Sequence, residues 1–207
     1  MTTSPIVATT RRRWERLAYV AVGLLGVAVA LVAFRPHTFS GAVIQSPSPA
    51  PALEGLTFHD GRPAELWRFD GDVTLLFFGY THCPDICPTP LAAVARAKEH
   101  MGSDGERVHV VMVTVDPARD TADDLESYVT HFDPSFLGAT GTAQALRSAA
   151  TVYGIHVEVG EGTVDSGYTV DHTASLIAID TDGFVRVVYP TDVAPDALAS
   201  DLEELLG

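Results

Sequence analysis

The stretch "VTLLFFGYTHCPDICPTPL", residues 73–91, places a strand, two cysteines and the start of a helix next to one another. Its first eight residues form a nearly continuous apolar run, which is typical of a strand buried on both faces. Thr89 followed by Pro90 predicts a helix start, since threonine is a favoured cap and proline a favoured first helical residue. The chain's two cysteines, Cys83 and Cys87, therefore fall between a strand and a helix.

The sequence beyond this stretch continues the alternation of strands and helices. Residues 108–115, "VHVVMVTV", predict a second buried strand. A helical apolar face follows, and Thr121 with Asp124 resembles a capping box at its start. A third helix is expected over residues 142–153, and residues 175–189, "SLIAIDTDGFVRVVY", predict a hairpin around a Thr-Asp-Gly turn.

The order of the expected elements indicates the fold class. Leu198, Leu202 and Leu205 mark a final helix after the hairpin. Strand, helix, strand, helices, hairpin and helix together outline an α/β thioredoxin-like sandwich, in which helices cover both faces of a central mixed sheet. The fold class alone does not identify a function.

The N-terminal part of the chain predicts a membrane anchor. Residues 17–34, "LAYVAVGLLGVAVALVAF", are 18 consecutive residues without a charge, enough for one transmembrane helix. Four of the five flanking arginines lie in the basic segment 1–16, so the positive-inside rule leaves the N-terminus cytoplasmic and the C-terminal domain extracytoplasmic. A cleaved signal peptide is the alternative interpretation, with residues 28–30, "AVA", as the cleavage site.

Composition separates a linker from a domain. Residues 35–52 contain "SPSPAPA" and are expected to form a semi-rigid spacer, whereas residues 53–207 have the usual size of one domain. The formal charge of the chain is −14; residues 1–35 contribute five arginines against one glutamate, or +4, so the remainder carries −18. Such a surface keeps a domain soluble, repels nucleic acid and suits a basic or metal-bearing partner.

The position of the cysteine pair indicates chemistry at the edge of a sheet. In open α/β sheets ligands bind where strands end, and a following helix N-terminus favours the thiolate form of a cysteine. Pro88 disfavours helical geometry at Cys87, so both cysteines are expected in a shaped loop. Such a loop can direct two sulfurs to one point, either for a disulfide or for a shared metal ion.

Three interpretations of the pair remain open at this stage. A structural disulfide over three intervening residues would constrain little of the unfolded chain. A thiol–disulfide oxidoreductase usually has the spacing C-x-x-C, which is one residue shorter, and residues 168–176, "YTVDHTASL", lack the proline expected opposite redox thiols. The third interpretation is a metal site.

A metal site needs a third ligand beside the two thiolates. Soft thiolates select Cu(I), and thiolate with imidazole also suits Cu(II) or Zn(II). His172 is the leading candidate, because it precedes a predicted strand and follows Asp171, whose carboxylate can orient the imidazole or raise its basicity. His82, next to Cys83, is interpreted as a solvated or supporting residue rather than a ligand.

Three segments resemble one family, in order and at matching intervals. "LLFFGYTHCPDICPTPL", "VTVDPARDT" and "VDHTASLIAIDTDG" resemble the Sco/SenC copper-binding proteins, which assist assembly of cytochrome c oxidase. The resemblance implies a thioredoxin-like fold in which Cys83, Cys87 and His172 bind one copper ion, Cu(I) or Cu(II). Asp85 matches the family's loop and is expected to tune the site, while Asp116 and Arg119 are expected to pair in the loop after the second strand.

Two functions follow from these expectations. The first is a membrane-tethered copper chaperone, more a metallochaperone than an enzyme, whose implied partner is the copper-bearing subunit of cytochrome c oxidase or another copper acceptor. The alternative is a membrane-tethered thiol–disulfide reductase, with Cys83 as the nucleophile and Cys87 as the resolving thiol. His172 separates the two functions, because copper binding requires it and disulfide exchange does not.

Overall fold

The computed structural model describes residues 18–26, 37–83, 87–164 and 167–207. The chain divides into two compact units, residues 1–38 and 39–207. In the first unit residues 18–26 are helical, whereas segment 1–16 and the remainder of the expected anchor lie outside the described residues. No helix in the described part of the chain has both the length and the apolar character needed to cross a membrane.

The second unit alternates strands and helices. In chain order its elements are β1 Ala42–Val43, β2 Leu56–Phe58, the 3-10 helix η1 Leu66–Phe69, β3 Val73–Gly79, α2 Pro88–Met101, the 3-10 helix η2 Gly102–Arg107, β4 Val108–Thr114, α3 Ala122–Thr130, β5 Leu137–Gly141, α4 Ala143–Val152, β6 Val157–Val159, β7 Val170–His172, β8 Leu176–Ile179, β9 Val185–Tyr189 and α5 Pro195–Leu206.

Seven strands form one mixed sheet in the order β1-β9-β8-β3-β4-β5-β2. Strands β3, β4 and β5 are parallel, and the others pair antiparallel to their neighbours. Gly79 at the end of β3 pairs with Thr114 at the end of β4, so the two carboxyl ends reach the same edge of the sheet. Strands β6 and β7 form a separate two-stranded sheet.

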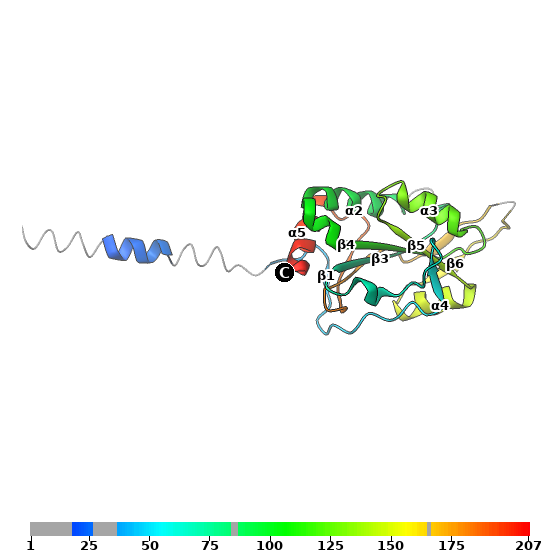
Figure 1. Cartoon of the computed structure of the whole chain (residues 1–207), viewed down its shortest axis with the longest axis horizontal. Coiled ribbons are helices and arrows are strands. Elements are labelled where there is room, and N and C mark those ends of the chain that lie inside the picture. Colours follow the sequence, from blue (N-terminus) through cyan, green and yellow to red (C-terminus); the bar gives the residue numbers. More distant parts are fainter. Residues whose placement is uncertain (1–17, 27–36, 84–86, 165–166) are drawn as a thin grey trace, which may run out of the picture. The chain divides into compact units, whose positions relative to one another are not determined.

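Both faces of the sheet are covered, as predicted. Helices α2, α3 and α5 lie on one side and α4 on the other (Figure 1). Successive side chains of a strand face opposite sides. In β3, Leu75 and Phe77 therefore point into the core under α2, α3 and α5, and Leu76 and Phe78 into the core under α4. A strand buried on both faces needs an uninterrupted apolar run, which is what residues 73–80 provide.

The folded unit starts earlier than the sequence predicts. It begins at Phe39, and β1 pairs with β9 at the edge of the sheet. Further along, Ala50 N donates a hydrogen bond to Gly183 O at 2.8 Å, within the segment expected to be a spacer. Prolines are tolerated along an edge strand, which has hydrogen-bonding neighbours on one side only. Composition therefore reveals the extended conformation of this segment but not its docking.

The helix and turn signals agree with the structure at several places. Thr121 and Asp124 form the predicted capping box at the start of α3, and Thr142 caps α4. Gly183 has φ of +79°, the left-handed conformation that the turn between β8 and β9 requires. The hairpin expected over residues 175–189 is formed by β8 and β9.

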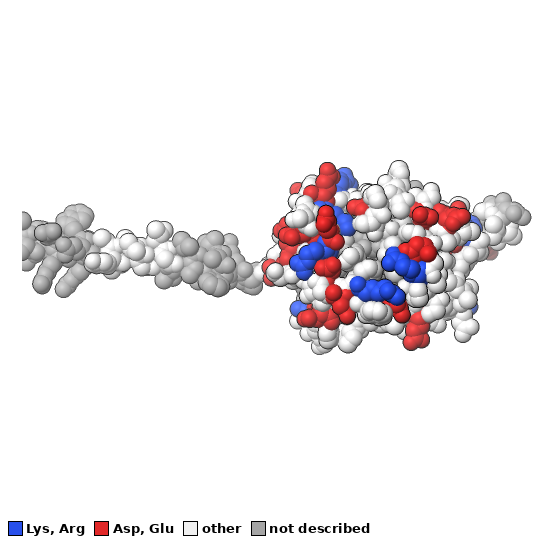
Figure 2. All heavy atoms as spheres, viewed as in Figure 1, with Lys and Arg blue, Asp and Glu red and all other residues white. Residues whose placement is uncertain are grey.

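Acidic side chains dominate the surface of the second unit. On the face shown in Figure 2 they are spread over the domain among fewer basic residues, several of which lie beside an acid. Arg62, for example, pairs with Asp60 at 2.6 Å, and Arg107 pairs with Asp72 at 3.0 Å. Exposed pairs of this kind contribute little to stability, about 0–1 kcal/mol each.

Candidate metal centre

The two cysteines lie at the carboxyl end of β3, on the edge where α/β sheets bind ligands. Helix α2 begins at Pro88, not at Pro90, and Cys87 is its N-cap with helical dihedral angles, φ −68° and ψ −35°. The predicted cap at Thr89 and the predicted non-helical geometry at Cys87 are therefore wrong. Proline is tolerated throughout the first turn of a helix, because the N–H groups there have no intrahelical acceptor.

Cys83 and Cys87 face each other across the start of α2. Neither is in a disulfide, and the backbone N–H of Cys87 donates to Cys83 Sγ at 3.4 Å. Cys87 is fully buried, whereas Cys83 is only half-buried. The two cysteines thus differ in burial: Cys87 lies in the core, and Cys83 lies nearer the surface.

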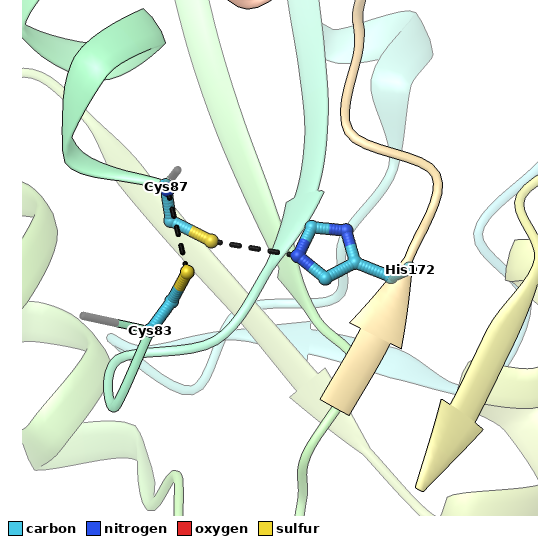
Figure 3. A group of neighbouring side chains, drawn as sticks. All are labelled: Cys83, Cys87 and His172. Carbon is cyan, nitrogen blue, oxygen red and sulfur yellow. Dashed lines mark hydrogen bonds between the residues drawn. The ribbon is translucent and has the colours of Figure 1, made fainter. Parts of the chain in front are cut away.

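His172 reaches the cysteines from the β6–β7 hairpin. Its Nε2 lies 3.5 Å from Cys87 Sγ (Figure 3). The rings of Phe77 and Tyr80 meet the imidazole edge-on, with centroids at 6.4 and 5.9 Å. One ligand atom from each of Cys83, Cys87 and His172 lies within 4.8 Å of the others, which is close enough for a single metal ion to contact all three. The structure thus brings together the three residues that the sequence analysis singled out.

Burial sets the protonation of the candidate ligands. It raises the pKa of the Cys87 thiol above its ordinary value. It also lowers the pKa of His172, an effect that the neighbouring backbone of Thr173 and the charge of Asp171 oppose. At neutral pH Cys87 is therefore a thiol and His172 a neutral imidazole, so a metal ion would meet a histidine ready to ligate and a thiol that must lose its proton.

Asp171 acts on His172 through its charge alone. Adjacent residues of a strand face opposite sides, so Asp171 is exposed while His172 is half-buried. Among the described residues Nδ1 of His172 is buried and has no hydrogen-bond partner. No hydrogen bond to Nδ1 by which Asp171 would orient the imidazole is present among the described residues. The charge of Asp171 acts to raise the pKa of His172. Asp85, the other expected supporting residue, lies outside the described residues.

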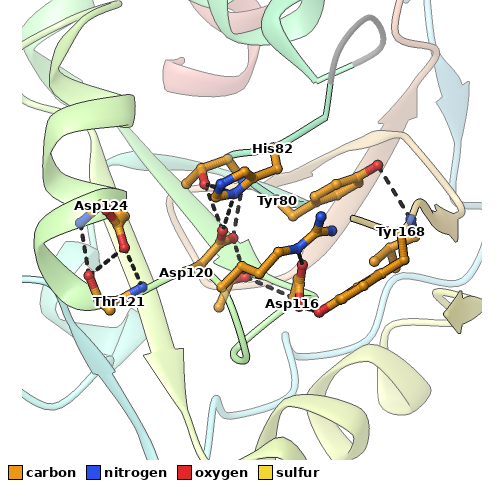
Figure 4. Close-up of polar contacts among 11 residues, drawn as sticks. Tyr80, His82, Asp116, Asp120, Thr121, Asp124 and Tyr168 are labelled. Carbon is orange, nitrogen blue, oxygen red and sulfur yellow. Dashed lines mark hydrogen bonds and ion pairs between the residues drawn. The ribbon is translucent and has the colours of Figure 1, made fainter. Parts of the chain in front are cut away.

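A buried carboxylate that the sequence analysis did not single out supports the cysteine loop. Asp120 accepts hydrogen bonds from Thr81 N at 3.1 Å, Thr81 Oγ1 at 2.6 Å and Thr114 Oγ1 at 2.6 Å (Figure 4). His82 lies over the same carboxylate at 3.5 Å and is half-exposed, consistent with its interpretation as a supporting residue. The only sequence signal for Asp120 is its place in "DPARDT", where the expected pair of Asp116 and Arg119 is confirmed.

Gly79 leaves the space that the buried sulfur occupies. A Cβ atom at this position would lie 3.1 Å from Cys87 Sγ and 2.6 Å from a ring carbon of Phe77. Its backbone conformation is not left-handed, so the requirement for glycine is one of space. In the sequence, a glycine at the end of an apolar strand does not by itself indicate that other side chains will pack this closely against it.

Gly79→Ala is expected to disturb the candidate centre without abolishing the fold. The added methyl must displace the ring of Phe77, which contacts His172, and it crowds Cys87 Sγ. Overpacking in a core costs about 1–3 kcal/mol. Thermal unfolding and copper titration of the variant measure the two effects. Gly71→Ala is an unsuitable control because φ at Gly71 is +92°. Gly138→Ala in β5 is the matched control, because its Cβ would lie 2.7 Å from Leu125 Cβ and overpacks the core without meeting a sulfur. Unaltered copper binding in Gly79→Ala would contradict this account of Gly79.

Comparisons with known proteins give matches over most of the folded unit. Residues 55–207 match the family model described as SCO1/SenC. Protein SCO1 homolog 1, mitochondrial, of Arabidopsis thaliana is 39% identical over 175 residues, which cover 79% of this chain and 51% of that protein. The chain spans about half the length of several curated mammalian relatives that it matches.

Two solved structures extend the similarity to three dimensions. Apo Sco1 from Thermus thermophilus has a TM-score of 0.72 and 39% identity, covering 82% of this chain and 98% of that one. ScoI of Bradyrhizobium japonicum, solved with copper bound, has a TM-score of 0.66 and 34% identity, covering 78% of this chain and 99% of that one. These matches agree with the predicted fold class, a mixed sheet with helices on both faces.

Proposed function

The chain belongs to the SCO1/SenC family, and on this basis we propose that it is a membrane-tethered copper chaperone that holds one copper ion on Cys83, Cys87 and His172. The observation that carries the proposal is the convergence of these three ligand atoms within 4.8 Å. A relative with 34% identity has been solved with copper bound, which supports copper as the metal.

The donor set fits copper in either oxidation state. Two thiolates are soft ligands that select Cu(I), and addition of an imidazole also suits Cu(II). Burial of Cys87 shields one side of the centre, while the half-buried Cys83 gives an incoming ligand access to the metal. Copper can then pass to an acceptor by stepwise exchange of ligands.

The proposed acceptor is the copper-bearing subunit of cytochrome c oxidase, and the proposed anchor is residues 17–34. The anchor would place the N-terminus in the cytoplasm and the copper-binding domain outside it. Holding donor and acceptor at one membrane raises their effective concentration, which favours transfer between weakly interacting partners. The support for the anchor is the run of 18 uncharged residues preceded by arginines.

A thiol–disulfide reductase is the second candidate, and the unequal exposure of the cysteines favours it. The accessible Cys83 would attack an acceptor disulfide, forming a mixed disulfide and releasing one acceptor thiol. Cys87 would then attack Cys83, leaving a Cys83–Cys87 disulfide and a fully reduced acceptor. Copper does not take part in this reaction, and His172 is not required.

A transfer assay distinguishes the two functions. The copper-loaded chain is mixed with the metal-free acceptor domain in its reduced form, and the copper-free chain, with both cysteines reduced, is mixed with the oxidised acceptor domain. The chaperone function is expected to load copper into the reduced acceptor, and His172→Ala is expected to impair the loading. If the reduced acceptor takes no copper while the oxidised acceptor is reduced equally well by His172→Ala, the reductase function is the correct one.

The affinity for Cu(I) is expected to rise with pH between about 6 and 8. The metal binds a thiolate, and burial raises the pKa of Cys87 above its ordinary value of 9.0, so Cys87 carries a proton throughout this range in the metal-free chain. Each thiol proton that copper displaces raises the apparent affinity about tenfold per pH unit. Competition with a Cu(I) chelator at several pH values measures the slope, and a flat profile would show that Cys87 is not a ligand.

A further inference from the structure

Three residues beside the metal centre connect the β6–β7 hairpin to the loop after β4. Tyr168 Oη donates a hydrogen bond to Asp116 Oδ1 at 2.6 Å, and Arg119 pairs with Asp116 Oδ2. The guanidinium carbon of Arg119 lies 3.8 Å from the centroid of the Tyr168 ring. Asp116, Arg119 and Tyr168 thus form one connected cluster, which we call the clamp. Figure 4 labels Asp116 and Tyr168.

Asp116 is buried in the clamp, Arg119 is nearly so and Tyr168 is half-buried, and the clamp depends on stacking. Asp116 is 3% exposed, and the side chain of Arg119 is 9% exposed. Within the part of the chain that the structure describes, Nη2 of Arg119 is buried without a hydrogen-bond partner. The guanidinium is therefore held by its ion pair and by aromatic rings. A lysine cannot reproduce this arrangement, because its ammonium is neither planar nor able to stack.

Tyr80 extends these contacts to His172. Its ring centroid lies 5.6 Å from the guanidinium carbon of Arg119, and its ring meets the imidazole of His172 edge-on at 82°. The Tyr80 hydroxyl also accepts a hydrogen bond from Val170 N, in the same strand as His172. An unbroken series of contacts therefore runs from the clamp to the third candidate ligand.

The hairpin that carries His172 has limited support apart from these contacts. In the described residues β6 and β7 pair only with each other, so no strand of the main sheet fixes their register. Val170 packs into the core, Val157 packs against it in part, and three residues link His172 to β8. However, a hollow of about 310 Å³ lies beside the hairpin, lined partly by Val157, Val159 and Tyr168. Close packing holds an element in place. On the side of the hollow, the β6–β7 hairpin lacks such packing.

We infer that the clamp positions His172, holding its strand so that the imidazole stays within reach of copper on Cys83 and Cys87. This inference rests on the proposed function, since it assigns a role in copper binding. Asp116, Arg119 and Tyr168 are positioning residues in this role, because none of them belongs to the group of candidate ligands.

The clamp is expected to matter more for Cu(II) than for Cu(I). Two thiolates alone can hold Cu(I), whereas Cu(II) in such a site needs the imidazole nitrogen. A shift of His172 therefore lowers the affinity for Cu(II) first. Loss of an outer partner that orients a ligand typically lowers metal affinity by about 10- to 100-fold, and we expect Tyr168→Ala to fall in this range.

The test compares graded variants of the full chain by Cu(II) affinity and electron paramagnetic resonance. Tyr168→Phe keeps the ring under Arg119 and loses only its hydrogen bond, so it should weaken Cu(II) binding less than Tyr168→Ala. Arg119→Lys keeps the charge and loses the stacking. In both Tyr168→Ala and Arg119→Lys, the nitrogen hyperfine coupling from His172 should weaken, a change that lower stability alone would not produce.

Two matched controls remove similar interactions elsewhere. Tyr153→Phe deletes a hydroxyl that donates to Pro51 O at 2.6 Å on the opposite face of the sheet. Arg107→Lys alters an ion pair with Asp72 at the amino end of β3. Both controls should bind Cu(II) as the unaltered chain does. Thermal unfolding of every variant confirms that the protein is folded when copper is added.

A double-mutant cycle decides the inference. If the clamp acts through His172, adding Tyr168→Ala to His172→Ala should change Cu(II) affinity by less than about twofold. An undiminished effect in that background, or clamp variants that bind Cu(II) as tightly as the controls, would overturn the clamp's role while leaving the proposed function intact. Failure of the unaltered chain to bind copper would instead overturn the proposed function and the clamp's role with it.

Discussion

Replacing Cys87 with serine is expected to lower the affinity of the chain for Cu(I) by more than about 100-fold, since loss of a mere outer partner of a ligand already costs about 10- to 100-fold. A serine hydroxyl is a hard, neutral donor in place of a soft thiolate. Cys87 is also the buried sulfur of the pair, and His172 Nε2 lies only 3.5 Å from it.

The Cys87→Ser experiment needs a control for sulfur as well as for folding. Met112 is fully buried and lies near Cys87. A Cβ atom placed on Gly79 would be 3.3 Å from the methyl carbon of Met112 and 3.1 Å from Cys87 Sγ. Met112→Leu conserves volume and removes this thioether. It should bind Cu(I) as the unaltered chain does in competition with a chelator. Weak binding by Met112→Leu together with normal binding by Cys87→Ser would show that the wrong sulfur has been identified.

His172→Ala is expected to weaken Cu(II) binding by more than about 100-fold and Cu(I) binding by a smaller factor. The imidazole is the only nitrogen ligand in the candidate cluster of the described residues. Its pKa is lowered by burial, so at neutral pH the ring is unprotonated and available to the metal. Parallel titrations with Cu(II) and with Cu(I) under reducing conditions measure the two affinities.

His156→Ala is the matched control for this variant. His156 precedes β6, pairs loosely with Glu158 at 3.7 Å and is largely exposed. It lies near the same hairpin but is not among the three candidate ligands. Its loss should leave both affinities unchanged. Equal losses of Cu(II) affinity in His156→Ala and His172→Ala would mean that the effect comes from disturbing the hairpin and not from removing a ligand.

The features that depend on a local sequence pattern are predicted correctly. The apolar run of β3, the capping box of α3 and the turn at Gly183 each depend on a few neighbouring residues. The convergence of His172 with the cysteines is different. Cys87 and His172 are 85 positions apart in the chain. Their convergence is predicted from the types of the residues and from the family resemblance, not from periodicity.

The remaining features depend on which segments meet in space. The predicted start of α2 is wrong because Pro88 and Pro90 are each compatible with the first turn of a helix, so the sequence allows more than one start. Docking of the edge strand β1 requires β9 as a partner, and nothing in the composition of residues 35–52 indicates this. The contact of Tyr168 with Asp116 joins residues 52 positions apart. The sequence predicts the local pair of Asp116 with Arg119, but neither segment indicates that Tyr168 will meet it.

The most direct test of the copper site is X-ray absorption at the copper edge, recorded on the full chain loaded with Cu(I). The expected result is one copper per chain, bound by two sulfur atoms and one nitrogen atom. The nitrogen contribution should disappear in His172→Ala, and one sulfur should disappear in Cys87→Ser. A spectrum without sulfur ligands, or one that neither substitution changes, would contradict the assignment of Cys83, Cys87 and His172 as the copper ligands.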